Sequence, residues 1–143
     1  MKDKFFIDTN ILVYSFSKEE PEKKEIASGL IHSALQSQKG VISYQVIQEF
    51  LNVSTKKFPV PLKSIDAAKY IDLVLNPLCQ VFSSITLYKT ALEIKDRWQY
   101  SFYDSLIISA ALESNCSTLF SEDLHHSQKI NSLEIINPFI ALQ

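Results

Sequence analysis

Short apolar segments alternate with longer amphipathic segments along most of the chain, and this alternation restricts the possible folds more than any other feature of the sequence. The apolar segments are nearly continuous and do not switch between apolar and polar residues. Such strands are typical of a sheet covered on both faces, and helices between strands are the usual connections of parallel strands. The sequence therefore predicts an α/β domain with a mainly parallel sheet.

The expected elements follow from apolar spacing and from the residues that begin or end helices. Ser43 and Thr86 are each expected to cap a helix, and Asn76-Pro77 is expected to end one. Strands are expected at 4–8, 41–43, 79–82, 117–120 and 133–137. Helices are expected at 10–16, 21–37, 44–57, 64–75, 87–99 and 102–114. All of these elements are expected to form one domain, residues 1–143.

Composition excludes several classes of function. Glycine occurs only at Gly29 and Gly40, so neither a P-loop nor a dinucleotide-binding glycine motif can be present. The net charge of −2 gives no support for a strongly basic nucleic-acid-binding protein. The sequence shows neither a signal peptide nor an apolar run that could cross a membrane, and its two cysteines lack metal-site spacing. A cytoplasmic protein with no membrane partner is expected.

Four acidic residues are expected at one edge of the predicted sheet. Asp8 ends the first strand, and Asp123 follows the 117–120 strand by three residues. Glu49 lies among apolar residues of the helix after the second strand, and Asp104 shares the apolar stripe of its own helix. Taken singly, three of them have an ordinary alternative: Asp104 as a first-turn acid, Glu49 as a surface residue and Asp123 as a cap or turn residue. Asp8 is the hardest to explain in this way, because few strands end in an acid for structural reasons.

A cluster of these carboxylates favours a bound divalent cation. Like charges in a partly dry site repel one another and would otherwise retain protons. Ligands that are all oxygen select hard ions, here Mg²⁺ or Mn²⁺. A cation held in this way can activate water and stabilise the charge that develops during an in-line displacement. The cluster therefore predicts hydrolysis of a phosphodiester bond.

Four segments together resemble the PIN-domain ribonucleases, and most closely the VapC-type toxins of toxin–antitoxin pairs. They are FFIDTNILVY, ISYQVIQEFLNV, FYDSLIISAAL and SEDL. The resemblance extends over essentially the whole chain and implies a three-layer α/β/α sandwich. It matches Asp8, Glu49 and Asp104 to the core acids of the family and Asp123 to a fourth, more variable acid. Glu122 competes for that fourth position, and Asp123 is preferred.

The same resemblance implies further roles and partners. Thr9 and Asn10 match a polar pair that orders the site, and Ser43 matches a hydroxyl group at the end of the second strand. The family uses Mg²⁺ or Mn²⁺ to activate water for attack on RNA. Toxins of this type are usually inhibited by a cognate antitoxin protein and usually form homodimers. Apart from the resemblance, the aromatic residues just before Asp104, namely Tyr100, Phe102 and Tyr103, are candidates to stack an RNA base, with core packing the expected role of Phe102.

Several alternatives remain open at this point. A haloacid dehalogenase phosphatase needs a second aspartate where Asn10 stands, and a receiver domain needs a phospho-accepting aspartate after a middle strand. Neither pattern is present. A PIN-like module that binds RNA or protein without cutting, and a housekeeping RNA-processing nuclease, are both compatible with the sequence.

Overall fold

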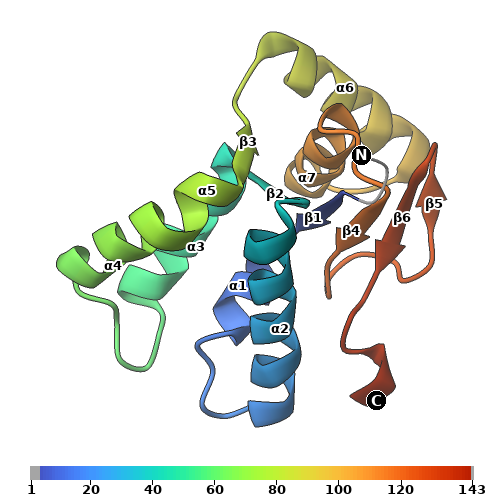
Figure 1. The fold of residues 1–143 in the computed structure, drawn as a ribbon. Helices are drawn as coiled ribbons and strands as arrows, with labels where there is room; N and C mark the ends of the chain where they lie inside the picture. The colour runs from blue at the N-terminus through green and yellow to red at the C-terminus, as the bar shows by residue number, and fades with distance from the viewer. Residues whose placement is uncertain (1–3, 143) are drawn as a thin grey trace.

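A single mixed sheet forms the centre of the protein in a computed structural model that describes residues 4–142 (Figure 1). The strand order is β3-β2-β1-β4-β6-β5. All neighbouring strands are parallel except β5 and β6, which are antiparallel. The strands are β1 (Phe5–Ile7), β2 (Gly40–Ser43), β3 (Cys79–Val81), β4 (Thr118–Phe120), β5 (Lys129–Ile130) and β6 (Leu133–Ile136). The prediction of a mainly parallel sheet is confirmed.

Helices cover both faces of this sheet. They are α1 (Thr9–Tyr14), α2 (Pro21–Ser37), α3 (Tyr44–Lys56), α4 (Ser64–Tyr70), the π-helix η1 (Ile71–Leu75), α5 (Asn76–Leu78), α6 (Ile85–Trp98), α7 (Phe102–Glu113) and the 3₁₀-helix η2 (Ile140–Leu142). Helices α1 to α5 lie on one side of the strands, and α6 and α7 pack together on the other (Figure 1). The predicted α/β/α arrangement is therefore present.

Successive strand residues are buried, as a sheet with two covered faces requires. Phe6 and Ile7 of β1 and Val41 and Ile42 of β2 are completely buried, although neighbouring side chains of a strand point to opposite faces. The apolar character of these strands therefore reflects burial on both sides. Within residues 4–142, no helix combines the length and the hydropathy that crossing a bilayer requires.

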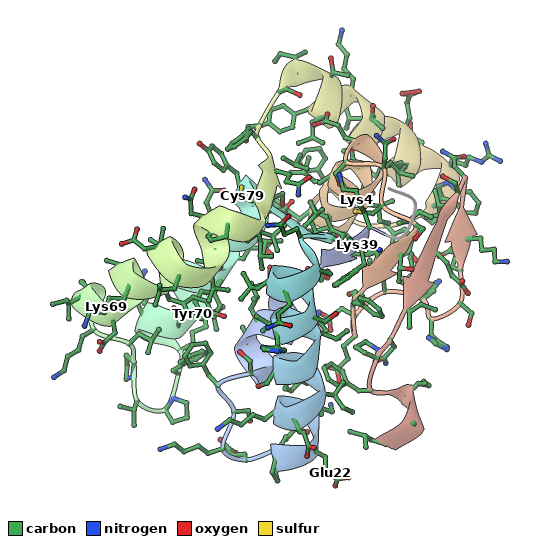
Figure 2. The ribbon with its side chains drawn as sticks, in the orientation of Figure 1. Lys4, Glu22, Lys39, Lys69, Tyr70 and Cys79 are labelled. Atoms are coloured by element: carbon green, nitrogen blue, oxygen red, sulfur yellow. The ribbon has the colours of Figure 1, made fainter. Side chains whose placement is uncertain are left out.

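An aromatic cluster joins the end of α1 to α3 and α4. The ring of Phe16 lies 5.7 Å from that of Phe50 and 5.2 Å from that of Tyr70, which is labelled in Figure 2. Phe50 and Tyr70 stack at 5.0 Å, and Phe58 closes the cluster. Burial raises the pKa of Tyr70 to about 12. The cluster anchors α1, which Asp8 caps, against the helix that carries Glu49.

Two expected helix ends differ from the structure. Ser84, rather than Thr86, caps α6: its Oγ accepts a hydrogen bond of 3.0 Å from the Leu87 backbone, and Thr86 is already inside the helix. The segment 64–75 also does not stop before Pro77. It continues through η1 into α5, and Pro77 is one of the first two residues of α5. Proline lacks a backbone N–H, but the N–H groups at the start of a helix have no acceptor within that helix, so Pro77 is tolerated there. The sequence pattern also does not predict the short strand β5.

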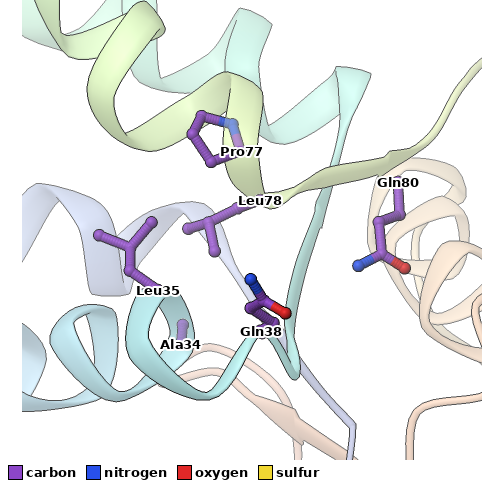
Figure 3. A pocket seen from close by; sticks show the side chains of 7 residues that line it. Ala34, Leu35, Gln38, Pro77, Leu78 and Gln80 are labelled. Atoms are coloured by element: carbon purple, nitrogen blue, oxygen red, sulfur yellow. The ribbon is translucent and has the colours of Figure 1, made fainter.

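A pocket of about 230 Å³ lies where β2 begins and α2 ends (Figure 3). It is lined by Ala34, Leu35, Gln38, Gly40, Pro77, Leu78 and Gln80. These residues include the first residue of β2, so the pocket opens near the amino-terminal end of that strand. The acidic residues of interest follow the carboxyl ends of the strands, and the pocket therefore does not contain them.

Candidate functional site

Asp8 is a buried carboxylate at the junction of β1 and α1. It caps α1 by accepting a hydrogen bond of 2.7 Å from the Thr9 backbone, and its second oxygen accepts one of 2.7 Å from the Ser121 hydroxyl. Only 8% of Asp8 is exposed. Burial raises the pKa of Asp8 to about 7, the nearby Glu49 and Asp123 carboxylates contribute to the rise, and the two hydrogen bonds oppose it. The charged form of Asp8 is therefore costly without a compensating positive charge.

Glu49 is held by two donors from different parts of the fold. The Thr9 hydroxyl donates to its Oε1 at 2.5 Å, and the Gln45 amide donates to its Oε2 at 2.9 Å. Ser43, the last residue of β2, caps the same helix, and its Oγ accepts a 3.5 Å hydrogen bond from the Val46 backbone. The strand end and its cap thus fix the start of α3, and α3 places Glu49 beside Thr9.

The segment after β4 carries Asp123 back to α1. The Asn10 amide donates to Asp123 Oδ2 at 3.1 Å, and its oxygen accepts from the Glu122 backbone at 3.3 Å. Ser121 Oγ accepts a 3.2 Å hydrogen bond from the Asp123 backbone while its own hydroxyl donates to Asp8. Asn10 and Ser121 therefore link the first acid of the chain to the last.

Glu122 points to a different set of partners. Its carboxylate pairs with the Lys23 ammonium at 2.5 Å and accepts a 2.5 Å hydrogen bond from the Tyr14 hydroxyl. This contact raises the pKa of Lys23, and burial together with Glu122 raises the pKa of Tyr14. A carboxylate neutralised in this way is a poor ligand for a second cation. Glu122 is therefore paired with Lys23, whereas Asp123 accepts its hydrogen bond from Asn10.

Asp104 lies in the first turn of α7. Ser101 caps this helix, because its Oγ accepts a 3.1 Å hydrogen bond from the Asp104 backbone nitrogen. The preceding residue, Tyr103, accepts a 3.2 Å hydrogen bond through its backbone oxygen from Gln45. Gln45 also binds Glu49, so the start of α7 is tied to the first turns of α3. This link joins Glu49 to the peptide group next to Asp104 and does not involve the Asp104 carboxylate.

The chemistry of these donors fits a hard divalent cation, although their arrangement in this structure is not a closed metal site. Within residues 4–142, no group of three or more Asp, Glu, His or Cys side chains is placed to hold a metal ion together. The carboxylates of Asp8, Glu49 and Asp123 instead accept hydrogen bonds from their neighbours. All of these donor atoms are oxygens, which suit such an ion. Burial, with smaller contributions from Glu49 and Asp123, raises the pKa of Asp8 to about 7, and a positive charge nearby would favour its charged form.

Sequence reasoning missed two residues of this region. Ser121 follows β4 directly, as Asp8 follows β1, and that position is a signal that could have identified it. Gln45 lies four residues before Glu49 on the same helix, a spacing that places the two side chains together. Its second contact, to Tyr103, joins residues 58 apart in sequence and leaves no local signal.

The fold and a family comparison agree. A model of the PIN domain matches residues 5–130. The chain belongs to the PIN-domain family. This PIN domain has no significant match among curated protein sequences.

Solved structures share the fold of this PIN domain. A toxin–antitoxin complex from Klebsiella pneumoniae aligns with a TM-score of 0.66 and 16% identity, covering 94% of this chain and 98% of that one. VapBC2 from Rickettsia felis, bound to a DNA fragment from its promoter, aligns with a TM-score of 0.62 and 19% identity, covering 92% and 96%. VapC20 of Mycobacterium tuberculosis, a toxin that cleaves the sarcin–ricin loop, aligns with a TM-score of 0.57 and 18% identity, covering 84% and 92%.

Proposed function

We propose that this PIN domain is an endoribonuclease dependent on Mg²⁺ or Mn²⁺, and that it is the toxin of a toxin–antitoxin pair. Membership of the PIN-domain family and structural similarity to VapC-type toxins support a toxin ribonuclease. The observation that carries the metal-dependent part is the burial of Asp8 beside Glu49 and Asp123, which raises the Asp8 pKa to about 7. A divalent cation would compensate the negative charge of these carboxylates.

Each acid has a role in the proposal. Asp8, Glu49, Asp104 and Asp123 hold the cation, directly or through water. When bound, the cation lowers the pKa of a water molecule and stabilises the charge on the phosphate. Thr9 orients Glu49, Asn10 orients Asp123, and Ser43 fixes the start of α3. No side chain is needed as a covalent nucleophile.

RNA is the proposed substrate, and Tyr103 is the proposed contact for an unpaired base. Tyr103 is 66% exposed and directly precedes Asp104. A flat aromatic ring beside the reacting phosphate can stack a base of any sequence. Replacing Tyr103 with alanine should therefore raise KM for RNA more than it lowers kcat.

A cognate antitoxin and a second copy of the chain are the proposed protein partners. The toxin–antitoxin complexes among the similar structures support an antitoxin. The exposed apolar residues Ile85, Tyr88 and Leu92 of α6 recur at helical spacing, which supports a homodimer that covers them. As part of the same proposal, residues 1–143 act as one domain in the cytoplasm.

The test is cleavage of a pool of cellular RNA by purified protein freed of any antitoxin. Reactions contain Mg²⁺ or Mn²⁺, or EDTA, and the Asp104→Asn variant controls for contaminating nucleases. Discrete cuts that need the metal and disappear in the variant are expected. A folded wild-type protein that cuts nothing with either metal would contradict the proposal.

A non-cutting module that binds RNA or protein is the second candidate. The observation that favours it is that, in the part of the chain described, no three potential ligand side chains are gathered around one point. Such a module would bind RNA equally well with EDTA and with Mg²⁺, and its binding would not change in the Asp104→Asn variant.

A further inference from the structure

One amide group connects the two helices that carry Glu49 and Asp104. Gln45 lies in the first turn of α3, and its Nε2 donates to Glu49 Oε2 at 2.9 Å and to the Tyr103 backbone oxygen at 3.2 Å. Tyr103 and Asp104 are consecutive residues in the first turn of α7. The same nitrogen therefore contacts one acid directly and the peptide group next to another.

The hydrogen bonds around Glu49 fix its orientation from both sides. Its Oε1 accepts from the hydroxyl of Thr9 on α1, and its Oε2 accepts from Gln45 on its own helix. A carboxylate with one donor on each oxygen cannot rotate without losing a contact. Of these two donors, Gln45 is the one that also reaches α7.

The orientation of the Gln45 amide is determined by its surroundings. The two groups that its nitrogen contacts, a carboxylate and a backbone carbonyl, are both acceptors, so a flipped amide would place oxygen against oxygen. The observed orientation leaves Gln45 Oε1 buried and without a hydrogen-bond partner among residues 4–142. An unpaired buried acceptor lowers the stability of the fold, and this loss opposes the stability that the two donor contacts contribute.

We propose that Gln45 is a positioning residue of the metal-dependent site. It holds the Glu49 carboxylate in a fixed relation to the start of α7, so that Glu49 and Asp104 serve the same cation. This role rests on the proposed function. In this role Gln45 acts through the two groups to which its amide nitrogen donates, the Glu49 carboxylate and the Tyr103 backbone oxygen.

The proposal predicts a loss of metal affinity when the amide is removed. Gln45→Met keeps the length of the side chain and loses both donors, and Gln45→Asn keeps the amide but is too short to reach both acceptors. Loss of a group that orients a metal ligand typically costs about 10- to 100-fold in metal affinity or activity. Both variants should therefore bind Mn²⁺ at least about tenfold more weakly than the wild type.

The experiment measures Mn²⁺ binding to the purified, metal-free protein by electron paramagnetic resonance, without RNA. The matched control is Gln48→Met, because Gln48 is on the same helix and is exposed. Circular dichroism and thermal melting in EDTA check that every variant is folded. Cleavage kinetics over a range of RNA concentrations then separate kcat from KM, and kcat alone should fall.

Three outcomes are distinguishable. Weaker Mn²⁺ binding and lower kcat in both Gln45 variants, with Gln48→Met like the wild type, support the positioning role. Folded Gln45 variants that bind Mn²⁺ as the wild type does overturn it while leaving the proposed function in place. A wild-type protein that binds no Mn²⁺ overturns the proposed function, and the role given to Gln45 falls with it.

Discussion

At the scale of single residues, burial makes the charged form of Asp8 costly and raises its pKa to about 7. The sequence shows that Asp8 ends an apolar strand, and a carboxylate at such a position is costly to bury without a partner. The position of Ser121 directly after β4 is also visible, but its hydrogen bond to Asp8 depends on the pairing of β1 with β4, which brings together residues 113 apart in sequence. The sequence thus predicts the acid but not the donor that orients it.

Asp8→Asn should stabilise the metal-free protein in a pH-dependent way. The folded-state pKa of Asp8 is raised from 3.8 to about 7, so the folded protein binds this proton more tightly than the unfolded chain does. The resulting stability is complete below about pH 4 and is lost as the pH rises through 7. At pH 8 the variant should be roughly 2–4 kcal/mol more stable than the wild type, and at pH 4 about equal.

Thermal melts in EDTA at about pH 4, 6 and 8 measure this difference, since they run from close to the unfolded-state pKa of 3.8 to above the folded-state pKa of about 7. The asparagine can keep both contacts, because its oxygen accepts from Thr9 and its amide donates to Ser121 Oγ. A difference in melting temperature that stays constant across the pH range would show that the Asp8 carboxyl is not the cause.

Two variants, Asp123→Asn and Glu122→Gln, should show which of the two acids that follow β4 contributes to metal binding. Glu122 is paired with Lys23, so Glu122→Gln should lower the free energy of unfolding by roughly 1 kcal/mol and leave Mn²⁺ affinity unchanged. Asp123→Asn should weaken Mn²⁺ binding and leave stability nearly unchanged. Calorimetric titration with Mn²⁺ and urea unfolding of both variants measure these effects. The reverse pattern would make Glu122 the fourth acid.

At the scale of elements, contacts between strands and helices explain both the successes and the errors of sequence reasoning. The parallel strands that the pattern predicts are held by burial on both faces, and burial leaves a strong apolar signal. Strand β5 has only two residues and exists because it pairs with β6, so no local pattern marks it. Ser84 and Thr86 both carry hydroxyl groups, and only the position of the helix start distinguishes them.

The two glycines of the chain should respond oppositely to alanine. A Cβ on Gly40 would lie 2.1 Å from the Ala34 Cβ, so β2 and the end of α2 would have to separate. Gly40→Ala should cost roughly 1–3 kcal/mol or more. Gly29 is exposed in α2 with nothing within 4 Å of such an atom, and Gly29→Ala should add about 0.5–1 kcal/mol. Urea unfolding of both variants provides the comparison, and equal effects would contradict the close approach of β2 to α2.

At the scale of the whole molecule, topology brings distant acids to one edge. Asp8 and Asp123 follow neighbouring parallel strands, and Ser43 ends the strand on the other side of β1. Because parallel strands end at the same edge of a sheet, this convergence can be predicted from the sequence. The link from α3 to α7 through Gln45 cannot be predicted from the sequence. It depends on how two helices on opposite sides of the sheet approach each other beyond the edge of the sheet.

The most direct measurement is the chemistry of the RNA ends produced in ¹⁸O-labelled water with Mg²⁺. Attack by water on the phosphodiester should leave one phosphate end and one hydroxyl end, with ¹⁸O in the phosphate. These ends should be absent with EDTA and in the Asp104→Asn variant. Ends that carry a 2′,3′-cyclic phosphate, or labelled ends that form equally well without a divalent cation, would contradict a site in which Asp8, Glu49, Asp104 and Asp123 direct metal-dependent hydrolysis.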